Sequence, residues 1–355
     1  MQKEHSTILP PTEFQLGNRF IGSQHPPLVI AEIGINNNGD VGKAIQMVDD
    51  AKNSGCECVK FQSHVIDDEM IKNDVVPGNA SEGIWEIISK CVLTKEEEQT
   101  IKHYVEQQGM IFLSTPFSRA AADRLQSMDV IAFKIGSGEC NNYPLIAHIA
   151  TCKKPVILST GMNDIDTIRP AVKILRANQV SFAILHCTSI YPTPYDKVRL
   201  GALRDLSEAF PDAVIGLSDH SIGNYTCFAA VALGHGAILE KHFTSTHEWP
   251  GPDISLSILP TELHELIKGS AAIYSAMGGK KSILPEEQPT IQFAYASVVS
   301  TKPIRAGEQL TEDNCWVKRP GTGDIPAKDY DRVLGLSVKT NVVADVQISW
   351  SMLDV

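Results

Sequence analysis

The chain has 355 residues, of which 43% are hydrophobic and 21% are charged, so it can bury a large core and is neither disordered nor fibrous. Its 31 lysine and arginine residues against 42 aspartates and glutamates give a net charge of −11, which excludes a global electrostatic attraction to nucleic acid or to an anionic membrane. An anionic substrate must therefore be met by locally placed cations.

The eight cysteines are scattered along the chain, and only Cys56 and Cys58 stand close together. This spacing matches no paired metal-binding motif and predicts reduced thiols in a cytoplasmic enzyme. The residues around Glu4 and His5 form no apolar run of the signal-peptide type, and no window approaches the roughly 18 apolar residues of a membrane span. We expect a soluble cytoplasmic protein without a membrane or nucleic-acid partner.

Residues 1–27 are polar and proline-containing, which predicts an N-terminal arm. A regular rhythm then begins, with eight short apolar or β-branched runs at residues 28–33, 58–62, 110–114, 131–136, 155–159, 182–186, 214–218 and 237–240. Segments with helical periodicity lie between most of them, at residues 42–53, 95–108, 118–128, 164–178 and 224–233. Alternation of strands and helices predicts parallel pairing, and eight units favour an α/β fold of the (β/α)8 TIM-barrel type over residues 28–277. An open doubly wound sheet is the alternative.

The pattern changes after the last predicted barrel helix, at residues 260–277. Residues 278–292 have no periodicity and are predicted to be a linker. Residues 293–355 carry short strand-like runs at 297–300, 316–318, 335–338 and 346–350, separated by glycines and prolines. They predict a second, small domain that is rich in β-structure.

Unusual polar residues collect at the ends of the predicted strands: Glu32, Lys60, Gln62, Ser114, Thr115, Lys134, Glu139, Ser159, Thr160, His186, Ser189, Ser218, Asp219, His220, Glu240, Lys241 and His242. In a barrel these ends meet on one face, where active sites lie. The clearest case is the stretch 133–139, whose Lys134 and Glu139 leave one short apolar strand together. A lysine there points either into a functional cavity or into a buried ion pair.

Lys60 and Lys134 are the cations among these strand ends, and Thr115, Ser137, Ser159 and Ser218 supply hydroxyl groups around the same mouth. Two ammonium groups and several hydroxyl donors suit a phosphate, whose oxygens accept charge-assisted hydrogen bonds. The alternative for the serines is capping of the helices that follow.

His220 and His242 end consecutive strands and are expected to be neighbours. Two imidazoles can bind a divalent cation, with Glu32 or Asp253 as carboxylate partners, and such an ion would polarise a carbonyl oxygen. General acid–base catalysis and packing are the alternatives for these two histidines. His186 is interpreted either as a core histidine or as a ligand. The proline-containing loops 191–195 and 77–80 are predicted to border the pocket and to influence specificity.

Several long strings resemble bacterial sialic acid synthases, from about residue 14 to the C-terminus: Ala-Glu-Ile-Gly-Ile-Asn (31–36), Ser-Thr-Pro-Phe-Ser (114–118), Phe-Lys-Ile-Gly-Ser-Gly-Glu-Cys-Asn-Asn (133–142), Leu-Ser-Thr-Gly-Met (158–162), Tyr-Pro-Thr-Pro-Tyr (191–195), Gly-Leu-Ser-Asp-His (216–220), Pro-Gly-Pro-Asp (250–253) and Val-Lys-Arg-Pro-Gly (317–321). The small domain is similar to the antifreeze-like (SAF) domain of that family.

The resemblance implies a transferase that condenses phosphoenolpyruvate with the open-chain aldehyde of N-acetylmannosamine and water, giving N-acetylneuraminate and phosphate by C–O cleavage. It places Lys60, Thr115, Lys134, Ser137, Ser159 and Ser218 around phosphoenolpyruvate, with Ser189 at one phosphate contact. Glu32 and Glu139 match family acids, and Glu139 is expected to act as acid/base or to stabilise an intermediate. Asn79, Tyr191 and Asp253 are expected to face the sugar, and Gln62 is expected to be a further substrate-binding residue.

The resemblance further implies that His220 and His242 hold a divalent metal, Mn²⁺ in the first place, with Mg²⁺ or Co²⁺ as alternatives. Arg319 of the small domain would recognise the N-acetyl group in the barrel of a partner subunit, in a domain-swapped homodimer.

Three positions depart from the family pattern: Asn37 stands where many members have histidine, Phe61 where the closest motifs have histidine, and Ser189 where asparagine is common. Phe61 resembles legionaminic acid synthases, so the alternative sugar is a 2,4-diacetamido-2,4,6-trideoxymannose. A remote alternative is a non-catalytic sugar-binding protein.

Overall fold

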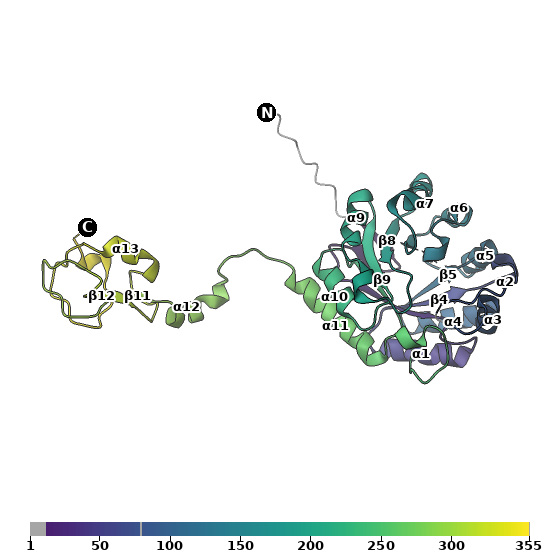
Figure 1. Ribbon diagram of the computed structural model, residues 1–355, viewed down its shortest axis with the longest axis horizontal. Coiled ribbons are helices and arrows are strands. Elements are labelled where there is room, and N and C mark those ends of the chain that lie inside the picture. Colours follow the sequence, from purple (N-terminus) through teal and green to yellow (C-terminus); the bar gives the residue numbers. More distant parts are fainter. Residues whose placement is uncertain (1–11, 79, 355) are drawn as a thin grey trace, which may run out of the picture. The chain divides into compact units, whose positions relative to one another are not determined.

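The computed structural model describes residues 12–78 and 80–354, and the chain divides into two compact units between Gly278 and Gly279. The larger unit is built on an eight-stranded parallel sheet (Figure 1). Its strands are β3 (Leu28–Gly34), β4 (Cys58–Ser63), β5 (Ile111–Pro116), β6 (Phe133–Ile135), β7 (Val156–Ser159), β8 (Phe182–Cys187), β9 (Val214–Asp219) and β10 (Ile238–His242). The strands pair in the order β5-β4-β3-β10-β9-β8-β7-β6, and the first and last strands of this order, β5 and β6, also lie next to each other. The sheet is therefore a near-closed barrel, which confirms the predicted TIM-barrel architecture.

Helices surround the strands (Figure 1). The longer ones are α1 (Val41–Asn53), α3 (Ile84–Cys91), α4 (Lys95–Gln107), α5 (Arg119–Ser127), α6 (Tyr143–Ala150), α7 (Ile165–Ala177), α9 (Ala202–Ala209), α10 (Tyr225–Ala232) and α11 (Pro260–Ala276). Short helices occupy loops after the strands: α2 (Ile66–Glu69), η1 (Ser137–Glu139), α8 (Tyr195–Val198) and η2 (Ile254–Leu256). Side-chain oxygens of Asp40, Thr94, Ser118 and Asp164 accept backbone N–H groups of the first turns and so fix where α1, α4, α5 and α7 begin.

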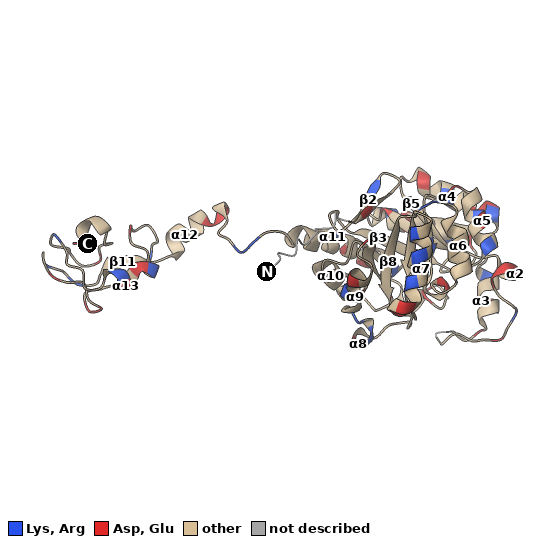
Figure 2. Ribbon diagram, turned by 90° about the horizontal axis from the view of Figure 1, so that it is seen from above, with Lys and Arg blue, Asp and Glu red and all other residues tan. Residues whose placement is uncertain are grey.

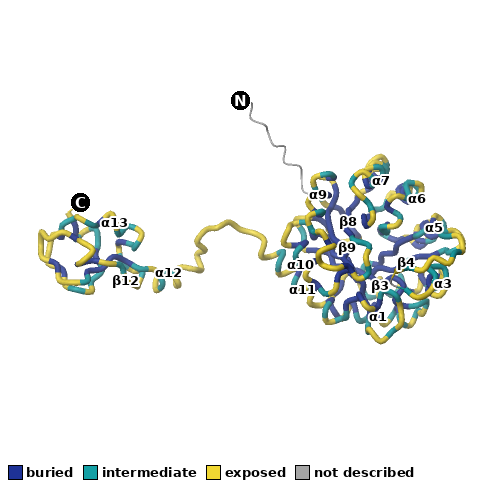
Figure 3. The backbone as a smooth tube through the Cα atoms, viewed as in Figure 1, coloured by how far each residue is buried: buried dark blue, intermediate teal, exposed yellow. Residues whose placement is uncertain are grey.

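The strands are buried on both faces, whereas the helices expose their outer sides (Figure 3). Successive strand residues point alternately into the barrel and toward the helices. Val59 and Phe61 of β4 belong to the outer core against the helices, and Cys58 belongs to the interior core. Many lysines and arginines lie on helices such as α5 and α7, outside the sheet (Figure 2). The alternation within each strand therefore decides which of its side chains reach the barrel interior.

An antiparallel hairpin of β1 (Glu13–Leu16) and β2 (Arg19–Gly22) precedes the barrel, within the segment predicted as an arm. Phe14, Leu16 and Ile21 pack in the interior core with Leu28 and Ile238, the first residues of β3 and β10. The hairpin thus fills the amino-terminal end of the barrel with apolar side chains.

The smaller unit has its own apolar core around Val298, Leu310, Ile325 and Ile348. Its elements are η3 (Pro285–Glu287), α12 (Gln288–Ala294), β11 (Ser297–Ser300), β12 (Cys315–Lys318), η4 (Ala327–Asp329), α13 (Tyr330–Val333) and η5 (Trp350–Met352). The strand runs predicted at 335–338 and 346–350 form single bridges, such as Val338 to Leu353, and no regular strand. Helix α12 begins in the segment predicted as a linker and ends two residues beyond it, in the predicted small domain. Across residues 12–78 and 80–354, no helix has the length and apolar character needed to cross a membrane.

Candidate active site

Inward-facing strand residues change from apolar to polar toward the carboxyl ends of the strands. In β4, Cys58 belongs to the apolar interior core, and Lys60 and Gln62 follow at every second position. The same spacing in the other strands builds a central cavity of about 290 Å³. Its walls are Glu32, Lys60, Gln62, Thr115, Phe117, Lys134, Gly136, Ser137, Gly138, Ser159, Met162, Cys187, Ser189, Tyr191, Ser218, His220, Glu240 and His242.

Two lysines and two glutamates form a buried cluster at the bottom of the central cavity. Nζ of Lys60 lies 2.7 Å from Oε2 of Glu32 and 3.7 Å from Oε1 of Glu240. Nζ of Lys134 lies 3.6 Å from the same Glu240 oxygen. Burial opposes ionisation of Glu240, but Lys134 and Lys60 outweigh it and lower the pKa of this carboxyl, whereas burial raises the pKa of Glu32. Two lysine side chains thus face the carboxyl group of Glu240, and Lys60 also faces that of Glu32.

Hydroxyl groups hold the two ammonium groups in place. Lys60 donates to Thr115 Oγ1 at 3.1 Å, and Lys134 donates to Ser159 Oγ at 2.7 Å. Ser218 donates to Glu240 at 3.2 Å. Burial lowers the pKa of Lys134, against the attraction of Glu240. These six side chains therefore form one connected polar network with the lysines aimed at the cavity.

Gly161 lets two further hydroxyls approach each other. A Cβ atom at this position would lie 2.3 Å from Oγ of Ser189 and 2.8 Å from Oγ of Ser137. The Gly161 N–H donates to Ser137 Oγ at 2.9 Å, while Ser189 Oγ is buried and makes no hydrogen bond to the described residues. Both serines line the central cavity, as predicted.

His220 and His242 lie side by side at the rim of the same cavity, with ring centroids 5.3 Å apart, and Tyr191 packs on His220 at 4.1 Å. Nδ1 of His220 donates a hydrogen bond to the Thr188 carbonyl at 2.9 Å, so Nε2 is the ring nitrogen that is left to ligate a cation. Burial and the neighbouring cations lower the pKa of His242 well below its ordinary value. A neutral imidazole with a lone pair is therefore present beside a second ring.

The residues at this rim fit a divalent cation only in part. Nδ1 of His242 is buried and makes no hydrogen bond within the described chain, and the nearest carboxylate oxygen of Asp253 is 3.9 Å away. Burial opposes charging of His220, but Cys187 and the Thr188 carbonyl raise its pKa to about 9. In residues 12–78 and 80–354 no group of three His, Cys, Asp or Glu side chains is arranged to hold an ion. The two imidazoles supply ligands, and the remaining ligands would have to come from water or substrate.

A second cavity of about 370 Å³, the side cavity, meets the central cavity at Gln62, Phe117, Tyr191 and His242. One wall is apolar, and the other lining groups are polar or acidic. The remaining lining residues are Ile35, His64, Glu69, Met70, Pro77, Ile84, Ile87, Ile88, Pro252 and Asp253. Lysine and arginine are absent from this set of described residues.

Glu139 does not line the central cavity. It lies in η1 and faces a third cavity of about 470 Å³, together with Glu69, Phe117, Arg119, Asn142 and His148. Its Oε2 accepts the Asn142 amide at 2.6 Å. Burial raises the pKa of Glu139, and the nearby Glu69 adds to this effect. Phe117 lines all three cavities, whereas Glu139 lines only the third of them.

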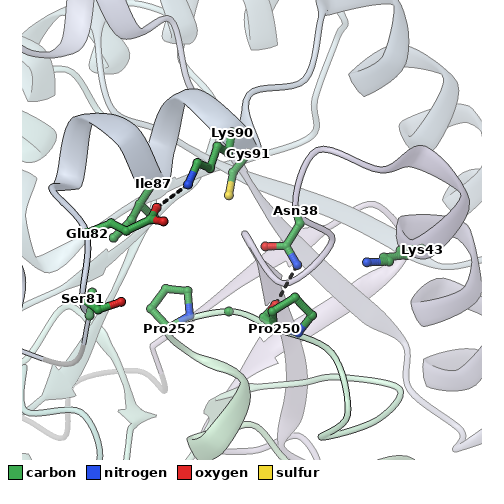
Figure 4. A pocket seen from close by; sticks show the side chains of 11 residues that line it. Asn38, Lys43, Ser81, Glu82, Ile87, Lys90, Cys91, Pro250 and Pro252 are labelled. Atoms are coloured by element: carbon green, nitrogen blue, oxygen red, sulfur yellow. Dashed lines mark hydrogen bonds and ion pairs between the residues drawn. The ribbon is translucent and has the colours of Figure 1, made fainter.

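An outer cavity of about 520 Å³ adjoins the side cavity at Ile87 and Pro252 (Figure 4). Asn38 donates to the Pro250 carbonyl at 2.7 Å and so ties the loop after β3 to the loop after β10. Lys90 is paired with Glu82, and Lys43 lies over the Trp249 ring at 5.2 Å. The cations of this region therefore lie outside the side cavity.

The sequence-predicted site residues are mostly brought together. Glu32, Lys60, Gln62, Thr115, Lys134, Ser137, Ser159, Ser189, Tyr191, Ser218, His220 and His242 all line the central cavity, and Asp253 lines the side cavity. Arg319 is an exposed residue of the smaller unit, and Asn79 lies outside the described residues. His186 faces the outer layer and bonds to the Val198 carbonyl, so it is a core residue.

Sequence reasoning assigned no role to Glu240, Cys187, His64 and Glu69. The alternation of β10 could have indicated Glu240, because it stands two residues before His242 on the same face. Phe61 does not line the pocket, because the same alternation turns it outward, where it stacks on Phe112 at 5.7 Å. It therefore gives no information on the sugar.

Comparison with known proteins agrees with this geometry. Residues 47–282 match the NeuB family, and residues 295–354 match the SAF domain. The chain belongs to the NeuB family. It is 32% identical to human N-acetylneuraminate-9-phosphate synthase, over 97% of this chain and 98% of that protein. It is 36% identical to N,N'-diacetyllegionaminic acid synthase of Campylobacter jejuni, over 90% of this chain and 97% of that protein.

Among solved structures, N-acetylneuraminic acid synthetase of Leptospira borgpetersenii superposes with a TM-score of 0.72 at 30% identity, covering 79% of this chain and 96% of that one. The resemblance to sialic acid synthases with a C-terminal SAF domain is thus confirmed. The chain is a phosphoenolpyruvate-condensing enzyme of the sialic-acid type, with phosphoenolpyruvate and an acylated sugar as the substrates that its family implies. Enzymes of the family are metal-dependent in general.

Proposed function

We propose that this enzyme condenses phosphoenolpyruvate with the open-chain aldehyde of an unphosphorylated, N-acylated mannose-type sugar, in the cytoplasm. C3 of phosphoenolpyruvate attacks the aldehyde carbon, water adds at C2, and phosphate leaves by C–O cleavage. The observation that carries the proposal is the junction of two unlike cavities: one holds buried lysines, and the other has room for a sugar. They meet beside His242 and Gln62, where a new C–C bond would have to form.

Phosphoenolpyruvate would occupy the central cavity. Its phosphate and carboxylate are matched by the ammonium groups of Lys60 and Lys134 and by the hydroxyls of Thr115, Ser137, Ser159 and Ser218. Ser189 has a buried oxygen without a hydrogen bond to the described residues and can donate to a phosphate oxygen. The pre-existing bonds from the lysines to Thr115 and Ser159 hold the ammonium groups in position before the anion arrives.

His220 and His242 are the residues that would hold the divalent ion, which we propose to be Mn²⁺, with Mg²⁺ or Co²⁺ as alternatives. A bound ion would polarise the sugar carbonyl as a Lewis acid. Glu32 lies against Lys60 and Gln62 at the same junction and is placed to exchange a proton with the reacting groups. Glu139 would contribute as an acid or base from the neighbouring cavity.

The sugar would occupy the side cavity, with Tyr191, Gln62 and Asp253 as its polar contacts. Asn79 is proposed as a further contact from its family motif alone. N-Acetylmannosamine, giving N-acetylneuraminate, is the first candidate. The apolar wall of Ile35, Met70, Ile84, Ile87 and Ile88 specifically favours the second candidate, a 2,4-diacetamido-2,4,6-trideoxymannose that gives a legionaminic acid, because its C6 methyl group needs no hydrogen-bond partner.

The test is phosphate release from phosphoenolpyruvate in the presence of Mn²⁺, comparing the two sugars at equal concentration. Release with either sugar supports the condensation, and the higher kcat/KM names the substrate. Absence of release with both sugars, in enzyme that still binds phosphoenolpyruvate, would contradict the proposed sugar class.

The smaller unit is proposed to act in trans. Arg319 is exposed on this unit, and its guanidinium N–H groups can donate hydrogen bonds to the carbonyl oxygen of an N-acyl group. We propose that it completes the sugar site of a partner subunit in a domain-swapped homodimer.

A further inference from the structure

His64 and Glu69 form a buried pair that has no assigned role in the condensation. His64 follows β4 and is 3% exposed, and its Nδ1 lies 2.8 Å from Oε2 of Glu69, the last residue of α2. The imidazole stacks on the Phe117 ring with centroids 4.7 Å apart and planes 10° apart. The ring is thus fixed in its plane by Phe117 and along its edge by Glu69.

Glu69 is itself held in place by its neighbour in α2. Oδ2 of Asp68 accepts the backbone N–H of Ala120 at 2.8 Å, in the first turn of α5. This bond anchors the four-residue helix α2 to the rim of the barrel. Glu69 therefore approaches His64 from a fixed backbone.

The other edge of His64 orients Gln62. Nε2 of His64 lies 3.1 Å from Oε1 of Gln62, and because an amide oxygen only accepts, Nε2 must donate. The Gln62 Nε2 then faces the opposite way and donates to Oε1 of Glu32 at 3.2 Å. The second oxygen of Glu32 is the one that lies 2.7 Å from Nζ of Lys60. A chain of contacts therefore runs from Glu69 through His64 and Gln62 to Glu32, in which the two ring nitrogens of His64 face the acceptor oxygens of Glu69 and Gln62.

The two ends of this chain lie in different cavities. Glu69 and His64 line the side cavity and are absent from the described lining of the central cavity, whereas Gln62 lines both. If the Gln62 amide were free to turn over, its oxygen would face the Glu32 carboxylate. The N–H₂ group of Gln62 would then no longer face the point where the sugar meets phosphoenolpyruvate.

We propose that His64 and Glu69 are positioning residues for the sugar, which hold the Gln62 amide with its N–H₂ group toward Glu32 and the junction of the cavities. This inference rests on the proposed function of the side cavity. It identifies the pair as a determinant of sugar binding that acts through Gln62, while phosphoenolpyruvate is bound by the lysines and hydroxyls on the other side of Gln62.

Glu69→Leu and Glu69→Gln test the role of the carboxylate. Leucine has a similar size and removes the acceptor, whereas glutamine keeps an oxygen for the Nδ1–H of His64. We expect Glu69→Leu to raise the KM of the sugar about tenfold to a hundredfold, the size of one lost hydrogen bond to a charged group. The dissociation constant of phosphoenolpyruvate, measured calorimetrically with Mn²⁺ and without sugar, should change less than about twofold. Such a change corresponds to much less binding free energy than one hydrogen bond contributes. Glu69→Gln should restore most of the sugar affinity.

His64→Phe removes both nitrogens and keeps the stacking on Phe117, so it should reproduce the Glu69→Leu pattern. Glu98→Leu is the matched control for loss of a buried carboxylate. Glu98 accepts hydrogen bonds from Ser63, beside His64, but faces Arg124 and α5 outside all the cavities. The Glu98→Leu substitution should lower the melting temperature and leave the KM of the sugar and the dissociation constant of phosphoenolpyruvate unchanged.

The outcomes distinguish a failure of the positioning role of His64 and Glu69 from a failure of the proposed function. Unchanged sugar KM in both Glu69→Leu and His64→Phe, with an active wild type, overturns the positioning role alone. Equal weakening of sugar and phosphoenolpyruvate also overturns it, because it indicates general damage to the site. A wild type that releases no phosphate with any acylated mannose-type sugar defeats the proposed function, and the positioning role with it.

Discussion

Lys241 donates a hydrogen bond of 2.8 Å to Asp219, and the two residues directly precede His242 and His220 on adjacent strands. Both side chains are almost completely buried and face the helices. Thr226 donates to the same Asp219 oxygen at 2.6 Å, and Lys241 also donates to the Ser221 carbonyl at 2.6 Å. This ion pair fixes the backbone on which both cavity-facing histidines stand.

Asp219→Asn should therefore be strongly destabilising, because it leaves the buried ammonium of Lys241 without its counter-charge. We expect the free energy of unfolding to fall by about 3–5 kcal/mol, as for other broken buried ion pairs. Denaturant unfolding measures this change. The double variant Asp219→Leu/Lys241→Met removes both charges and should recover part of the loss. A double variant less stable than Asp219→Asn would contradict this explanation.

His220→Ala should abolish metal-dependent turnover without unfolding the chain. The ring lies at the cavity rim and its removal costs no core packing comparable to that of an interior leucine. Phosphate release is measured over a Mn²⁺ titration, with the circular dichroism spectrum as the folding control. Activity that survives both this substitution and treatment with a chelator would refute the metal role of the histidine pair.

Asn142→Asp should move the acidic limb of the pH profile of kcat/KM to higher pH. The Asn142 amide now donates to Glu139 and opposes the effect of burial, which raises the pKa of that carboxyl. Aspartate removes the donor and adds a like charge, so the pKa of Glu139 rises further, while an oxygen remains to cap α6 at Leu145. The prediction holds if Glu139 acts in its ionised form.

Glu139→Gln is the companion variant, and it should lose this limb together with on the order of a hundredfold in kcat. A limb that persists in Glu139→Gln would assign it to another group.

The charge of the side cavity predicts discrimination against phosphorylated sugars. Glu69 and Asp253 line it, and its described lining contains no cation. A sugar 6-phosphate should have a kcat/KM at least about tenfold below that of the free sugar, because like charges would be brought together. A preference for the phosphorylated sugar that disappears in Lys43→Met would instead place the phosphate in the outer cavity of Figure 4.

The barrel could be predicted because apolar runs of strand length recur eight times, and a parallel strand buried on both faces leaves such a run in the sequence. The ends of the strands were located within about two residues, a common precision for element boundaries. The bridges around Val338 and Gln347 in the small unit were not recognisable, because a short β-rich run looks the same whether it forms a ladder or a single bridge.

The convergence of side chains on the central cavity was predictable where it follows from position in a strand, as for Lys60 and Lys134. Phe61 shows the limit of motif comparison, since it differs from related sequences at a position that faces away from the cavity. His64 and Glu69 escaped detection because their roles depend on contacts across a loop, and neither has a distinctive spacing. Glu139 was predicted as an acid or base of the site, and it lines a neighbouring cavity instead of the central one, which no spacing in the sequence indicates.

Arg319→Ala should raise the KM of the sugar about tenfold to a hundredfold, the effect of one lost charge-assisted hydrogen bond, with little change for phosphoenolpyruvate.

Mixing variants then tests whether the arginine acts in trans. Arg319→Ala has an intact barrel, and His220→Ala has an intact small unit, so each is defective by itself. In a domain-swapped heterodimer, the barrel of the first would receive Arg319 from the second, and one complete site would form. Co-refolded mixtures should therefore regain activity above the sum of the separate proteins at low sugar concentration. Equal activity before and after mixing, with heterodimers present by native mass spectrometry, would show that each subunit uses its own arginine.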